Sequence, residues 1–196
     1  MNNFKLKIKI LLLALSSTII AHSTYATSTT GSITQNVSPQ NLGISVDQFK
    51  TNFNKLASQI GAPQIKTIKL ESEGKEKSFT IQMPSNLVLT GYTNSNNAIT
   101  RMSVGLDIEG IPREDIGAHF QMLGGFAITA IKAIDQNKSD ERRDDAVQAV
   151  YESLLSDKKT LTTQNTKNRV YKNYKLAAFS NPKLGVIMIG VESNKR

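Results

Sequence analysis

The chain has 196 residues, no cysteine and no tryptophan, and its 24 lysines and arginines against 16 acidic residues give a formal net charge of +8. The lack of cysteine excludes disulfide staples and cysteine-ligated metal sites, so a hydrophobic core alone must stabilise the fold. Residues 157–196 carry 9 basic and 2 acidic residues, a net charge of 9 − 2 = +7, so the basic character belongs to the C-terminal segment.

The first 26 residues have the pattern of a secretory signal peptide. Three lysines within the first nine residues form a basic start, and residues 10–21 are apolar but too short to span a bilayer. The segment Thr24–Ala26 places small residues at the positions a signal peptidase inspects. We therefore expect cleavage near Ala26, a periplasmic or secreted location, and no transmembrane segment after the signal is removed.

A polar leader and a single domain are expected to follow. Residues 27–41 are rich in serine and threonine and almost free of apolar side chains, which predicts a disordered leader. Residues 42–193 are predicted to form one domain. It should open with a helix, because Ser45 and Gln48 have the spacing of a capping box and Gly61 supplies a C-terminal stop.

A run of short alternating segments then predicts strands. They lie at residues 64–70, 78–83, 87–93 and 98–108. The segments 78–83 and 98–108 alternate apolar with polar side chains, as strands of an antiparallel sheet do when one face is buried. The apolar face requires a cover, and helices are the expected cover.

Two helices joined by a polar turn form the centre of the chain. The first is predicted to begin at Pro112 and to run to Ile134, and its apolar residues occupy two sides. A helix of this kind lies between neighbours, and Gly117 and Gly124 within it predict the close approach of another backbone. The second helix is expected to start after Ser139 or Asp140 and to end near residue 155.

The predicted fold class is α+β, with a mainly antiparallel sheet covered by helices. Residues 157–168 are polar and are expected to form a loop with room for a short strand. Two strands at Arg169–Ser180 and Leu184–Glu192 then complete the order α-ββββ-αα-ββ. A helix followed by strands occurs twice in this order.

A ligand-binding candidate lies in the first of these two strands. Its members are basic and aromatic: Arg169, Tyr171, Lys172, Tyr174 and Lys175. Basic residues interleaved with tyrosines can bind an anionic glycan, lipid headgroups or single-stranded nucleic acid. The same residues also suit a solvated edge strand, in which lysine blocks unwanted pairing. On an unbroken strand, Arg169, Tyr171 and Lys175 would share one face, and Lys172 and Tyr174 the other.

Catalytic chemistry has little support in the sequence. After signal removal His119 is the remaining histidine, and no motif accompanies it. Two acidic pairs, Asp107 with Glu109 and Glu114 with Asp115, flank the predicted strand-to-helix junction, where solvated carboxylates are expected. We predict no catalytic residue, no metal site and no cofactor.

Three hypotheses follow for function. The first is an exported, non-enzymatic interaction protein that binds another protein as an inhibitor, an immunity-type factor or an envelope accessory factor. The alternative is a protein that binds an anionic envelope glycan or lipid through the basic C-terminal strand. A hydrolase built on His119 or the acidic pairs is the third.

Overall fold

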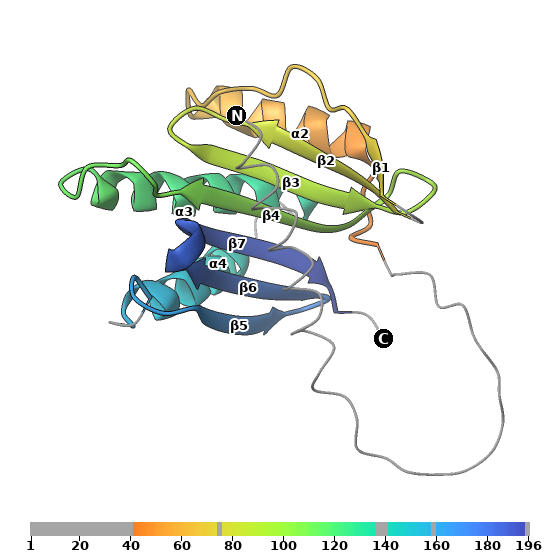
Figure 1. Ribbon diagram of the computed structural model, residues 1–196. Coiled ribbons are helices and arrows are strands. Elements are labelled where there is room, and N and C mark those ends of the chain that lie inside the picture. The colour runs from red at the N-terminus through yellow and green to blue at the C-terminus, as the bar shows by residue number, and fades with distance from the viewer. Residues whose placement is uncertain (1–40, 74–75, 136–140, 158–159, 195–196) are drawn as a thin grey trace, which may run out of the picture. The chain divides into compact units, whose positions relative to one another are not determined.

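In the computed structural model, residues 41–73, 76–135, 141–157 and 160–194 are described, and they form one antiparallel sheet with three α-helices (Figure 1). The strands are β1 (Glu71–Glu73), β2 (Glu76–Gln82), β3 (Leu87–Thr93), β4 (Ile99–Asp107), β5 (Asn165–Tyr171), β6 (Tyr174–Asn181) and β7 (Val186–Ser193). The helices are α2 (Val46–Gln59), α3 (Ile116–Ile134) and α4 (Glu141–Leu155), with a short 3₁₀ turn, η1 (Pro182–Leu184). The expected signal peptide and leader lie outside the described residues.

The predicted α+β class is confirmed, and so is the sequence of one helix, four strands and two helices, although three strands rather than two follow α4. The strands follow one another across the sheet as β1-β2-β3-β4-β7-β6-β5, and every neighbouring pair is antiparallel. The central pair joins β4 to the last strand of the chain, so the near-continuous apolar run of β7 lies in the interior of the sheet, as expected for such a run.

The prediction of a strand at 64–70 is wrong. Asn54 of α2 binds both backbone groups of Ile65: its Nδ2 donates to the carbonyl at 2.9 Å and its Oδ1 accepts from the N–H at 2.7 Å. A side chain therefore satisfies the backbone that a partner strand would otherwise have satisfied. The short edge strand β1 forms later in the chain, directly after the segment that was predicted as a strand.

The start of α2 agrees with the prediction in detail. Ser45 is the N-cap, its hydroxyl accepts from the Gln48 N–H, and the Gln48 side chain accepts from the Ser45 N–H. These reciprocal bonds satisfy two donors that a helix start otherwise leaves unpaired. Gly61 follows the C-cap with a φ of +65°, a conformation that favours glycine.

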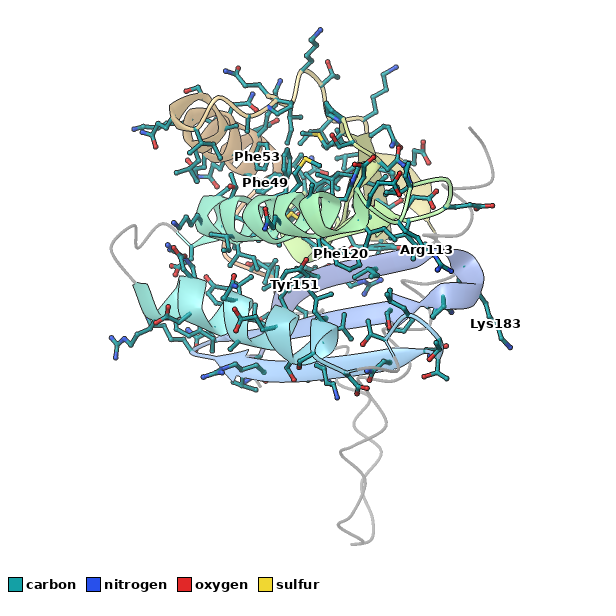
Figure 2. All side chains as sticks on the ribbon, turned by 90° about the vertical axis from the view of Figure 1, so that its left-hand side faces the viewer. Phe49, Phe53, Arg113, Phe120, Tyr151 and Lys183 are labelled. Carbon is teal, nitrogen blue, oxygen red and sulfur yellow. The ribbon has the colours of Figure 1, made fainter. Side chains whose placement is uncertain are left out.

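All three α-helices lie on one face of the sheet, with α3 between α2 and α4 (Figure 1). Helix α3 packs on β4 and β7 at the centre, while α4 packs on β5 and β6. On its α2 side, the Phe126 ring of α3 lies 5.9 Å from the Phe53 ring. Figure 2 shows Phe49 and Phe53 between α2 and α3. The two apolar sides of α3 thus reflect neighbours on two sides, as predicted.

Helices α3 and α4 meet at an aromatic ring that packs against a glycine. A Cβ placed on Gly124 would lie 3.2 Å from Cε1 of Tyr151, and the Tyr151 hydroxyl donates to the carbonyl of Phe120 (Figure 2). The close approach expected at Gly124 is therefore present, but a side chain makes it rather than a backbone. At Gly117 the expectation is wrong, because that position is exposed and has no neighbour within 4 Å.

Gly124→Leu should lower the free energy of unfolding by about 1–3 kcal/mol, because the added atoms must displace the Tyr151 ring. Gly125→Leu is the matched control, since Gly125 is exposed and nothing lies within 4 Å of its Cβ position. There, helix propensity should dominate and raise stability by about 0.5–1 kcal/mol. Chemical denaturation of both variants measures whether each change lowers or raises the free energy of unfolding. A stabilised Gly124→Leu variant would contradict the tight α3–α4 contact.

Candidate ligand-binding site

One side of α4 contributes a cation and a carboxylate to the site. Arg142, Asp145 and Ala146 are spaced three and four residues apart, which puts them on one face of the helix near its N-terminal end. The Arg142 and Asp145 side chains are exposed, while Ala146 is buried against the fold. This face of α4 looks toward β5, with which the helix packs.

The hairpin of β5 and β6 supplies the opposite side of the site. Arg169 and Tyr171 lie two residues apart on β5 and so point to the same face of the sheet. Tyr171 pairs directly with Tyr174 across the hairpin, which leaves Lys172 and Asn173 as a two-residue turn. Lys172 has a φ of +51°, the left-handed conformation such a tight turn uses.

These two sides form an open pocket of about 360 Å³. Its lining, which we call the cationic pocket, consists of Arg142, Asp145, Ala146, Arg169, Val170, Tyr171 and Lys172. Three side chains are cationic and one is anionic, so the pocket has a formal surplus of two positive charges. The Lys172 ammonium also lies 5.2 Å from the centre of the Tyr171 ring, within range of a cation–π contact.

A buried arginine fixes the start of α4 beside the pocket. The side chain of Arg143 is only 2% exposed, and its Nε lies 3.0 Å from Oδ1 of Asp144. Its Nη1 lies 3.6 Å from Oδ2 of Asp135 at the end of α3. A buried cation needs such partners, because an uncompensated charge in the interior is costly. Arg143 therefore has a structural task, and its neighbour Arg142 lines the pocket.

Tyr174 borders this group of charges on the helix-covered face of the sheet. Burial raises the pKa of the Tyr174 hydroxyl, and the negative charge of Asp135 raises it further. The positive charges of Lys172 and Arg143 act on the same pKa in the opposite direction. Tyr174 therefore lies close enough to Lys172 and Arg143 for their charges to change its pKa, although it does not line the pocket.

The predicted site residues are only partly brought together. Arg169, Tyr171 and Lys172 line the cationic pocket, whereas Lys175 lies on the opposite face of the sheet, with its Nζ 3.7 Å from Oε1 of Glu192. The prediction of one unbroken strand over residues 169–180 was wrong. It therefore placed Lys175 on the same face as Arg169 and Tyr171. The turn at Lys172 reverses the chain, which puts Tyr171 and Tyr174 on one face and Lys175 on the other.

Lys175 instead belongs to a row of charges that crosses the face opposite the helices. In register across β6, β7 and β4 lie Lys175, Glu192 and Arg101, and Arg101 continues the row to Glu76 with an ion pair of 2.8 Å. Burial raises the pKa of Glu192, and the neighbouring cations Lys175 and Arg101 lower it by less. Desolvation therefore outweighs attraction at Glu192.

This shift predicts how the stability of the protein depends on pH. Because the folded pKa of Glu192 lies above its unfolded value, its contribution to stability is present at low pH and is lost as the pH rises through the folded pKa. The difference in Tm between Glu192→Gln and the wild type should therefore increase in favour of the variant from about pH 3 to about pH 7. Glu114→Gln, at an exposed position outside the sheet, corrects for the loss of one negative charge. A difference that falls with pH would mean that the ion pair with Lys175 dominates.

His119 and the acidic pairs lie elsewhere. The Nδ1 atom of His119 lies 2.9 Å from the carbonyl of Asp115, one turn earlier in the chain. Asp107 uses its Oδ1 to accept from the Glu109 N–H at 3.0 Å, which is a local turn contact. Neither His119 nor the acidic pairs line the cationic pocket. Within the described ranges no group of three or more His, Asp or Glu side chains is placed to hold a metal ion.

Arg142 and Asp145 were not predicted as site residues from the sequence. The spacing of the two residues placed them on one face of α4, but only the packing of α4 on β5 brings that face beside Arg169. A contact between elements this far apart in the chain leaves no local pattern.

Comparison with known proteins finds no family model, no curated protein and no solved structure that matches this chain. In the part of the chain that the structure describes, no helix is long and apolar enough to cross a membrane.

Proposed function

We propose that this is an exported binding protein without catalytic activity, and that it holds an anionic group of an envelope glycan or lipid in the cationic pocket. The observation that carries the proposal is the convergence of Arg142, Arg169 and Lys172 from two separate elements on one concave site. Arginine is well suited to this task because its planar guanidinium can form two parallel hydrogen bonds with a carboxylate or phosphate.

The surroundings of the Arg169 side chain support the proposal. Among the described residues, its side chain has no hydrogen-bond or ion-pair partner, although Asp145 lines the same pocket. An arginine of an edge strand that only protects against pairing needs no pocket and no second cation opposite it. The combination of a concave shape and cations on both sides therefore favours ligand binding over edge protection.

Binding of a protein partner, the first hypothesis from the sequence, stays a prediction. Among the described residues, we find no surface for a protein partner that is as clearly formed as the cationic pocket. A partner that presents an acidic side chain could nevertheless use the same cations, so the experiment must separate a polymer or lipid from a protein.

The test is retention of the purified protein on immobilised heparin and on lipopolysaccharide across a series of salt concentrations. Retention should fall steeply with salt, because binding replaces counterions of the polyanion. Replacing Arg142, Arg169 and Lys172 together with glutamine should weaken binding about tenfold or more, since a hydrogen bond to a charged group contributes about 1.5–3 kcal/mol.

A control variant with the same net charge makes the test specific. Lys55, Lys66 and Lys69 are exposed and lie outside the pocket, so their replacement by glutamine removes an equal charge elsewhere. This control should keep most of the binding. Equal losses in the two triple variants would mean that general charge, and not the pocket, causes retention. If neither matrix retains the wild type while a pull-down from an envelope extract yields one specific protein, the protein-partner hypothesis replaces this proposal.

A further inference from the structure

The cationic pocket contains a carboxylate that a simple anion site would exclude. Asp145 is exposed, lines the pocket with the three cations, and has no hydrogen-bond or ion-pair partner for its side chain among the described residues. An ionised carboxylate only accepts hydrogen bonds, so it repels the oxygens of a bare phosphate or sulfate. A ligand that satisfies both Asp145 and the arginines must carry a donor close to its anionic group.

The donor could be an ammonium or a hydroxyl, and the surroundings of Asp145 favour the hydroxyl. Arg142, Arg169 and Lys172 repel a second cation in the same space. The face of Tyr171 that could attract an ammonium is already approached by Lys172 at 5.2 Å. A hydroxyl has no charge, so it can donate to Asp145 without meeting this repulsion.

The remaining lining leaves one aromatic side chain to contact a ring. Tyr171 is half-buried and lines the pocket, whereas Val170 pairs with Lys175, so its side chain points to the opposite face of the sheet. The volume of about 360 Å³ lies near the lower end of the range for small-molecule pockets, which is about 300–1,000 Å³. That size suits one or two sugar rings rather than a polymer held along its length.

We infer that the pocket binds an acidic sugar, whose carboxylate or phosphate is held by Arg142 and Arg169 while a neighbouring ring hydroxyl donates a hydrogen bond to Asp145. This inference rests on the proposed function and specifies its ligand class. Uronic acids and sugar phosphates share the required chemistry, which is an anionic group beside hydroxyls on a ring.

Isothermal titration of the purified protein tests the inference with four probes: a glucuronate-containing disaccharide, glucose 6-phosphate, inorganic phosphate and a neutral disaccharide. At least one acidic sugar should bind about tenfold more tightly than inorganic phosphate, and the neutral disaccharide should bind more weakly than the acidic one. Which of the two acidic sugars binds better distinguishes a carboxylate from a phosphate ligand.

The variant Asp145→Asn distinguishes recognition of a sugar hydroxyl from binding of the anionic group alone. It should weaken binding of the acidic sugar about fivefold, because it removes the acceptor charge for the hydroxyl, and it should leave phosphate binding unchanged or stronger. Asp47→Asn, an exposed position on α2, is the control and should change neither affinity.

The possible failures are distinguishable. Inorganic phosphate that binds as tightly as both acidic sugars, or an Asp145→Asn variant that binds acidic sugars more tightly, would overturn the sugar inference and leave an anion-binding pocket. If none of the anionic probes binds, and heparin and lipopolysaccharide also fail to retain the protein, both the sugar inference and the proposed function are overturned.

Discussion

The contact of Tyr151 with Gly124 fixes how α4 meets α3. Helix α3 is placed by the centre of the sheet, on β4 and β7, and α4 is then placed by the ring that fills the space above Gly124 and donates to Phe120. The interior of a protein is close-packed, so a ring in such a contact leaves little freedom to slide. The position of α4 in turn sets the distance between Arg142 and the β5 strand.

The order of the strands divides the domain into two similar halves. Helix α2 precedes the antiparallel run β2-β3-β4, and α4 precedes the antiparallel run β5-β6-β7, with β4 and β7 adjacent at the centre. Helix α3 belongs to neither run and lies over the junction (Figure 1). This position explains why its sequence is apolar on two sides, a pattern that an ordinary surface helix does not show.

Features that depend on neighbouring residues could be predicted from the sequence, and features that depend on distant contacts could not. The capping box of Ser45 and Gln48 is local and is present as expected, whereas β4 is buried on both faces and does not show the predicted solvated face. The segment 64–70 failed because Asn54, ten residues before its start, takes the hydrogen bonds of Ile65. The pocket was found only from its β5 side, because Arg142 and Asp145 reach it through the packing of α4.

The two-residue turn at Lys172 and Asn173 has a consequence for how this protein can vary. Strand β6 is fixed by its pairing with β7, whereas β5 is an edge strand held on one side only. Inserting or deleting a single residue in the turn would shift β5 by one position against β6 and exchange its two faces. Arg169 and Tyr171 would then point away from α4, and the pocket would lose half of its lining while the core kept its residues. A substitution of Asn173 should therefore disturb the pocket far less than a change in the length of the turn.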